Sequence, residues 1–154
     1  RIGALISIEQ GNSLEEFINT GIPIHSDISN QLITNIFIPN TPLHDGAVII
    51  RDYKIVAAAC YLPLSENKMI PKELGTRHRA AIGLSEVSDA ITIIISEETG
   101  KVSVAIREKL HRELSSSELV EVLSEQLVVE DQGDAEPTIV RWVRDFFKGG
   151  RSNG

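Results

Sequence analysis

Cysteine, methionine and aromatic residues are scarce in this sequence. Its 154 residues include one cysteine, one methionine and one tryptophan, and aromatic side chains make up 5% of the chain. The lone Cys60 cannot form an internal disulfide, which excludes a disulfide-stabilised scaffold, and the apolar run around it predicts a buried, unreactive thiol. No apolar run approaches the ~20 residues of a membrane-spanning helix, so we predict no membrane span within this sequence.

Motifs of several common enzyme classes are missing too. The sequence has no G-x-x-x-x-G-K-[ST] phosphate loop, no G-x-G-x-x-G after a strand, no zinc-spaced set of Cys and His, and no G-x-S-x-G turn. The common nucleotide-binding folds and the serine hydrolases are therefore disfavoured. An excess of positive charge is also absent, because the net charge is −7, and we expect no nucleic-acid partner.

The order of apolar and polar segments predicts an α/β (α+β) fold. A content of 42% apolar residues is enough for one sizeable core. We therefore expect a mixed, largely buried central β-sheet flanked by helices. Strand-like runs occupy residues 4–8, 47–51, 54–62, 91–95 and 102–106. Helix-like segments occupy residues 13–18, 27–36, 76–85 and 115–128, and capping-box spacing is found for Ser13 with Glu16 and for Ser115 with Glu118.

The two ends of the sequence differ from the rest. Residues 129–154 begin with an acidic linker and continue into a basic amphipathic segment, and we expect the folded domain to span residues 1–128. The amphipathic segment suits a membrane surface or a partner, while packing against the domain and disorder are the alternatives. The chain begins with Arg1 and its methionine is Met69, so we expect a domain excised from a longer protein.

The most informative stretch lies at residues 43–47, on a proline-rich turn before a strand-like run. An ionised Asp45 can accept a hydrogen bond from a sugar hydroxyl or attract a cation, and His44 can offer a ring nitrogen to a metal. Gly46 lets a ligand approach the backbone. The alternative is that this Asp-Gly pair forms only a turn.

A second polar cluster, at residues 75–81, is predicted to open a helix. The backbone amides of Gly75 and Thr76, together with the helix dipole, favour an anion there, and Arg77 or Arg79 can bind phosphate oxygens. These two arginines lie about 200° apart around an ideal helix. Both therefore reach one phosphate chain only with an irregular turn or a second subunit. The alternative is a solvated helix face.

Two carboxylates, Glu97 and Glu98, follow another strand-like run. Adjacent residues of a strand point to opposite faces, so we expect at most one of them to face a site shared with His44. A histidine, a carboxylate and phosphate oxygens suit Mg²⁺ or Mn²⁺, whereas the alternative is a solvated turn. We expect His25 and His111 to be surface or structural residues. Together the clusters predict an enzyme that uses a nucleotide with a metal ion.

The two clusters also match a known family. The segments LHDGA at 43–47 and GTRHRAA at 75–81 resemble the DGA and RHR motifs of the diadenylate cyclase (DAC) domain family. The similarity covers roughly residues 1–127 and implies the DAC-domain fold. The membrane-anchored CdaA/DacA branch is similar in the surrounding segments, which read RIGALI, IFIPNTPLHDGAVII, AACYLPLS, SEETG and LHREL.

The resemblance implies that two ATP molecules are condensed into cyclic di-AMP, with release of two pyrophosphates and with Mg²⁺, Mn²⁺ or Co²⁺ as cofactor. The residues that it makes catalytic are Asp45, Gly46, Ala47, Arg77, His78 and Arg79. The residues that it places at ATP are Asp45, Gly46, Tyr61, Leu62, Gly75, Thr76, Arg77, Ser96 and Glu98. The residues that it assigns to the metal are His44, Glu97 and Glu98.

The resemblance gives some of these residues particular roles. Asp45 would lie near the ribose 3′-hydroxyl and would activate or orient it. The ring of Tyr61 would stack on the adenine, and the backbone of Leu62 would read the edge of the base. Phosphate contacts would come from Thr76, Arg77 and Ser96.

The implied reaction needs two subunits. In-line attack of a 3′-oxygen on the α-phosphorus of the other ATP requires positioning and charge neutralisation more than a protein nucleophile. Because each ATP supplies both a nucleophile and an electrophile, we expect a two-fold, face-to-face homodimer. The resemblance also implies a cytoplasmic domain of a membrane-anchored bacterial protein, controlled by a membrane-bound regulator and by phosphoglucosamine mutase. The alternatives are an ATP-binding sensor without turnover and a metal-dependent phosphoesterase that releases AMP or ADP.

Overall fold

The computed structural model describes residues 2–127, 140 and 143–144. The chain divides into two compact units, residues 1–112 and residues 113–154, which are described separately. The domain boundary that we predicted after residue 128 stays a prediction. Within the described residues, no helix combines the length and the apolar character that a membrane crossing needs.

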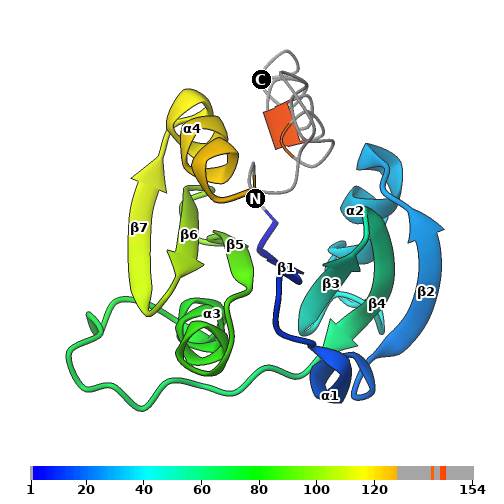
Figure 1. Ribbon diagram of the computed structural model, residues 1–154, viewed down its shortest axis with the longest axis horizontal. Helices are drawn as coiled ribbons and strands as arrows, with labels where there is room; N and C mark the ends of the chain where they lie inside the picture. Colours follow the sequence, from blue (N-terminus) through cyan, green and yellow to red (C-terminus); the bar gives the residue numbers. More distant parts are fainter. Residues whose placement is uncertain (1, 128–139, 141–142, 145–154) are drawn as a thin grey trace. The chain divides into compact units, whose positions relative to one another are not determined.

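A seven-stranded sheet with the strand order β2-β4-β3-β1-β5-β6-β7 forms the centre of the fold (Figure 1). Strand β1 pairs in parallel with β3, whereas the pairs β1–β5, β2–β4, β3–β4 and β5–β6 are antiparallel, so the predicted mixed sheet is confirmed. The strands are β1 (Ala4–Ile8), β2 (Ile22–Asp27), β3 (Ala47–Arg51), β4 (Lys54–Cys60), β5 (Ile91–Ile95), β6 (Val102–Ile106) and β7 (Lys109–Leu114).

Helices cover both faces of the sheet in the first unit. Helices α1 (Glu15–Ile18) and α3 (Thr76–Val87) lie on one face, and α2 (Asn30–Ile36) lies on the other (Figure 1). All five residues of β1 and the first four of β3 are buried, which agrees with the expectation of a largely buried central sheet. Near-continuous runs of apolar residues are typical of such strands.

Small residues let α3 pack closely against the sheet and the loop that follows β4. Ala81 and Leu84 share a hydrophobic core with Leu5 and Ile94. A Cβ atom at Gly83 would lie 1.8 Å from the carbonyl oxygen of Pro63, so no larger residue fits this position of the helix. The loop after β4 is thereby held directly on α3.

The structure corrects the sequence prediction at the first two helices. The helix expected over residues 27–36 begins at Asn30, where the Ser29 hydroxyl accepts a 3.1 Å hydrogen bond from the Leu32 amide. Residues 22–27 form the edge strand β2, whose mostly exposed side chains gave no apolar run. Helix α1 begins at Glu15, so the capping box expected for Ser13 does not form there.

The last residues of β4 and α3 also differ from the prediction, and one strand was not predicted. Strand β4 ends at Cys60 rather than at residue 62, and α3 continues to Val87 rather than stopping at residue 85. Strand β7 was missed because its sequence, KLHREL, is mostly polar and exposed. The strands expected at residues 4–8, 47–51, 91–95 and 102–106 are confirmed to the residue.

The second unit contains helix α4 (Ser116–Leu127). Its predicted capping box is confirmed: the Glu118 amide donates to the Ser115 hydroxyl, and the Ser115 amide donates to the Glu118 carboxylate, both at 3.1 Å. Val140 and Val143 are buried. Arg144 is exposed, and the other residues of the predicted linker and amphipathic segment lie outside the described part of the chain.

Candidate active site

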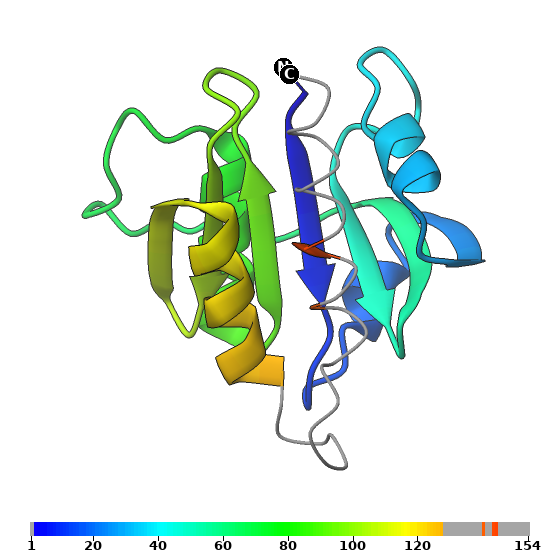
Figure 2. The same cartoon turned by 90° about the horizontal axis from the view of Figure 1, so that it is seen from above.

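Strand direction brings four segments of the chain to one end of the sheet. β1 and β3 run in parallel and both begin at this end, with Ile6 opposite Val48. β4 and β5 run the other way and end there, as Ala47 opposite Cys60 shows for β4. We call this region the site end, formed by Gly3, Asp45, Tyr61 and Ser96 with their chain neighbours. Figure 2 shows the start of β1 beside the end of β5.

The turn before β3 is tightly packed against β4. Gly46 has a φ of +116°, and a Cβ atom there would lie 2.8 Å from the carbonyl oxygen of Cys60 and 2.9 Å from the carbonyl carbon of Ala59. Ala59 itself has a φ of +54°, and the pairing register of β3 and β4 shifts between Ala47 and Ile49. Both the dihedral angle and the space at position 46 therefore require glycine. The turn leaves the side chain of Asp45 exposed directly before β3.

His44 is held in one orientation by the backbone. Its Nδ1 atom lies 2.7 Å from the carbonyl oxygen of Thr41. A carbonyl oxygen can only accept a hydrogen bond, so Nδ1 is the donor, and the neutral form of the ring then has its lone pair on Nε2. This is the arrangement in which a histidine binds a metal through Nε2, so His44 fits the role predicted for it.

The start of α3 is connected to the site end by an ion pair. Helix α3 follows Gly75, and the guanidinium of Arg77 lies 3.5 Å from the carboxylate of Glu97, just after β5. Arg79 is half-buried, and its carbonyl oxygen accepts a 3.0 Å hydrogen bond from the Ser65 amide. The structure thus brings Arg77 to the site end, while the backbone of Arg79 fixes the loop after β4.

His78 lies inside the fold. Its imidazole is 9% exposed. Burial lowers its pKa, and the positive charges of Arg112 and Arg77 lower it further, so the ring is neutral near pH 7. The helical spacing of His78 with the buried Ala81 and Ile82 was a sequence signal for this burial. A catalytic role for His78 stays a prediction.

The segment after β4 presents an aromatic ring. Tyr61 is 78% exposed, so its ring is free to stack on a planar group. Its amide donates a 2.8 Å hydrogen bond to the Thr20 hydroxyl, a contact between distant residues that no sequence pattern indicated. Leu62 is buried in the core next to Tyr61 and anchors this segment. The predicted adenine contacts of both residues stay predictions.

Glu97 and Glu98 lie in a turn rather than on strand β5, which ends at Ile95. The argument from strand alternation therefore does not apply to them, and this part of the sequence reasoning was wrong. The turn is closed by hydrogen bonds from the Gly100 amide to the Ser96 carbonyl at 2.8 Å and from the Thr99 amide to the Ser96 hydroxyl at 3.3 Å. Ser96 thus shapes the turn that carries both carboxylates.

The described residues contain no group of three or more His, Cys, Asp and Glu side chains that could hold a metal by themselves. His44, Glu97 and Glu98 therefore do not form a complete cage within one chain. Mg²⁺ commonly uses one or two protein ligands together with phosphate oxygens and water, so the donor set is compatible with a metal that arrives with a nucleotide. Which of these residues bind the metal stays a prediction.

The comparisons with known proteins assign the chain to a family. Residues 1–110 match the family model described as DisA bacterial checkpoint controller nucleotide-binding, or DAC. The chain belongs to the DAC family. The resemblance inferred from the two motifs is thereby confirmed. Among curated relatives, the chain is 62% identical over 123 residues to the protein named cyclic di-AMP synthase CdaA of Bacillus subtilis (strain 168).

Solved structures support the same assignment. A double cysteine mutant of DacA from Staphylococcus aureus matches with a TM-score of 0.79 and 56% identity, over 81% of this chain and 83% of that one. A hypothetical membrane spanning protein from Bacillus cereus matches with a TM-score of 0.70 and 47% identity, over 73% of this chain and 55% of that one. The match to the Bacillus subtilis relative covers 80% of this chain but 45% of that protein.

Proposed function

We propose that the protein is a diadenylate cyclase that condenses two ATP molecules into cyclic di-AMP and two pyrophosphates. The observation that carries this proposal is that the Asp45 turn and the Arg77–Glu97 ion pair lie at the same end of the sheet of a DAC domain. The name of the relative that is 62% identical, cyclic di-AMP synthase, supports it.

The proposed reaction forms two phosphodiester bonds. The 3′-oxygen of each ATP attacks the α-phosphorus of the other, gives its proton to the Asp45 carboxylate or to water, and displaces pyrophosphate along the line of attack. Asp45, exposed before β3, accepts a hydrogen bond from the 3′-hydroxyl and orients it. No serine or cysteine nucleophile is needed, which agrees with the burial of Cys60 and with the raised pKa, about 11, that burial gives its thiol.

Positive charge for the phosphates comes from the start of α3. The amides of the first turn after Gly75 and the guanidinium of Arg77 bind phosphate oxygens, with Thr76 beside Arg77 in the chain and Ser96 beside Glu97, the ion-pair partner of Arg77. A divalent cation, proposed to be Mg²⁺ or Mn²⁺ with Co²⁺ as a further candidate, neutralises phosphate charge when it is bound. His44, whose Nδ1 is bonded to the Thr41 carbonyl, would hold it through Nε2 together with Glu97 or Glu98.

We propose that the active form is a homodimer in which two site ends face each other. One site end holds one ATP, so a single subunit can bind the nucleotide but cannot close the ring. We further propose that the domain is the cytoplasmic part of a membrane-anchored bacterial protein, a view supported by the membrane spanning relative from Bacillus cereus. Control by a membrane-bound regulator and by phosphoglucosamine mutase rests on the family resemblance.

The decisive experiment compares the wild-type protein with Asp45→Asn after incubation with ATP and Mn²⁺ or Mg²⁺. Chromatography with mass detection should find cyclic di-AMP and pyrophosphate with the wild type, and at least about 100-fold less product with the variant at similar ATP affinity. Bound but unchanged ATP with the wild type would favour the sensor alternative, and release of AMP or ADP would favour a phosphoesterase. Strong residual synthesis by Asp45→Asn would remove Asp45 from the catalytic role.

A dilution series tests the shared reaction centre. Specific activity should decrease once the protein is diluted to concentrations below the dissociation constant of the dimer, because each product molecule needs two subunits. A preparation shown to be monomeric whose activity is strictly proportional to protein concentration would contradict the dimer.

A further inference from the structure

Gly3 lies where the side chains of Arg77 and Glu97 meet. It directly precedes β1 and is buried. A Cβ atom at Gly3 would lie 2.7 Å from an Nη atom of Arg77, 2.8 Å from its Cζ atom, and 3.0 Å from the Cβ atom of Glu97. The guanidinium of Arg77 therefore rests on the backbone at Gly3, in space that any other residue would fill.

The need for glycine at position 3 comes from this space and not from backbone conformation. Among the described glycines, positive φ angles are found at Gly46 and Gly100, so the backbone at Gly3 is one that other residues adopt. The two atoms nearer than 3.0 Å belong to the far end of the flexible Arg77 side chain, and the Cβ atom of Glu97, at 3.0 Å, need shift by only a few tenths of an ångström. An alanine there would thus leave the fold intact and would move the guanidinium of Arg77.

The position of Gly3 connects both halves of the site end. β1 is the central strand, paired with β3 on one side and with β5 on the other. The start of β3 follows Asp45, and the end of β5 leads to Glu97. A guanidinium resting on Gly3 is therefore held at a fixed place between the carboxylate proposed to orient the 3′-hydroxyl and the turn proposed to hold the metal.

We propose that Gly3 is a positioning residue for ATP binding, which sets the place of the Arg77 guanidinium and so of the phosphates that it binds. This inference rests on the proposed function, because it takes Arg77 as a phosphate ligand. Gly3 itself contributes no group to the ligand and acts through Arg77.

The test measures the affinity for an ATP analogue with a non-cleavable α–β linkage, in the presence of Mg²⁺, by isothermal titration calorimetry. The proteins are the wild type, Gly3→Ala, Arg77→Ala and the double variant. Gly3→Ala should bind about tenfold more weakly than the wild type, as expected when one charge-assisted hydrogen bond is misplaced. In the Arg77→Ala background, Gly3→Ala should cause no further loss, because the residue through which it acts is gone.

Gly11→Ala is the matched control at the other end of β1. A Cβ atom at Gly11 would lie 2.9 Å from a carboxylate oxygen of Asp89, again the end of a polar side chain. This variant should keep wild-type affinity for the analogue. Thermal unfolding of all variants then shows whether Gly3→Ala folds as well as this control.

The outcomes separate this inference from the proposed function. If the wild type binds the analogue and Gly3→Ala binds it equally well, the role of Gly3 is overturned while the proposed function stands. If Gly3→Ala lowered the affinity equally in the wild-type protein and in the Arg77→Ala background, the role of Gly3 would also be overturned. Gly3 would then act through some residue other than Arg77. If the wild type binds no ATP analogue, the proposed function fails, and the role of Gly3 fails with it.

Discussion

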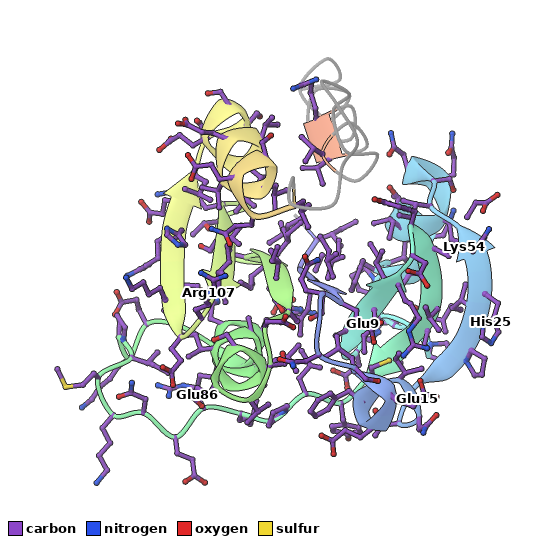
Figure 3. All side chains as sticks on the ribbon, viewed as in Figure 1. Glu9, Glu15, His25, Lys54, Glu86 and Arg107 are labelled. Carbon is purple, nitrogen blue, oxygen red and sulfur yellow. The ribbon has the colours of Figure 1, made fainter. Side chains whose placement is uncertain are left out.

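The two ends of the sheet are held together in different ways. At the far end, defined by Glu9, Glu15 and Arg51, short ion pairs connect β1, α1 and β3: Arg51 lies 2.8 Å from Glu9 and 2.8 Å from Glu15. The Glu9 carboxylate also accepts a 2.8 Å hydrogen bond from the Leu14 amide. Glu9 and Glu15 of the far end are labelled in Figure 3. The charges of the far end thus satisfy one another.

The site end relies on close backbone packing instead. There the turn at Gly46 lies against β4, and the ion pair of Arg77 with Glu97 spans 3.5 Å with a carboxylate that is 64% exposed. Such a pair contributes little to stability. The far end is thus stabilised by short, paired charges, whereas the site end combines close backbone packing with one longer, partly exposed ion pair.

The largest expected effect comes from Gly46→Ala. This change forces alanine into a φ of +116° and within 3 Å of the backbone of β4, which should lower the free energy of unfolding by about 3 kcal/mol. Urea denaturation measures it. The matched control is Gly100→Ala, also at a positive φ but with nothing within 4 Å of the added Cβ atom, where about 1 kcal/mol is expected. Equal losses at both positions would mean that backbone packing does not hold the site end.

Arg51→Ala should have the next largest effect. It leaves the Glu9 carboxylate, whose side chain is 12% exposed, without its ion-pair partner, and should lower the free energy of unfolding by about 2 kcal/mol. Turnover per folded molecule should not change, because the far end contributes nothing to the proposed site. The control Lys54→Ala removes an exposed pair with Asp27 and should change stability little. A loss of turnover in folded Arg51→Ala protein would show that the two ends are coupled.

The central strands were predictable from the sequence because the residue types within each strand favour a β-strand without help from distant parts of the chain. ITIII in β5 and the VII core of AVIIR in β3 are runs of β-branched residues, which favour a buried strand. The Ser115 capping box likewise involves residues three apart in the chain, so its spacing alone located the start of α4.

The edge strands and the site geometry could not be predicted in this way. β2 contains Pro23 and mostly exposed side chains, so its pairing with β4 depends on the rest of the sheet. The clusters at residues 43–47 and 75–81 were recognised as motifs, but the contact of Arg77 with Glu97 depends on strand register. The space at Gly3 depends on that contact in turn. The sequence motifs therefore indicated candidate site residues but not how these residues are arranged in space.

The smallest expected effect is a difference in pH dependence between the two ends. Near the site end, the folded-state pKa of His78 lies below its ordinary value of about 6.5, so the unfolded chain takes up a proton first as the pH falls. Stability should therefore decrease below about pH 6.5 until the folded histidine is also protonated. At the far end, the hydrogen bond from Arg51 lowers the folded-state pKa of Glu9 below about 4.5, against the opposing effect of burial. Its contribution is present above that pH and is lost as the pH falls through the folded-state pKa.

Urea denaturation between pH 8 and pH 3 should resolve these two steps, each with a slope of at most about 1.4 kcal/mol per pH unit. His78→Gln should remove the step that begins near pH 6.5 and leave the acidic step, because Glu9 keeps its partners. Arg51→Ala should leave the step near pH 6.5 and reduce the acidic step, since Glu9 then loses the largest cause of its lowered pKa. The acidic step should not vanish, because the pKa values of Asp27 and Glu118 are lowered by other partners. If either variant removed both steps, the two ends would titrate as one unit, and the contrast between a charge-stabilised far end and a separately stabilised site end would be wrong.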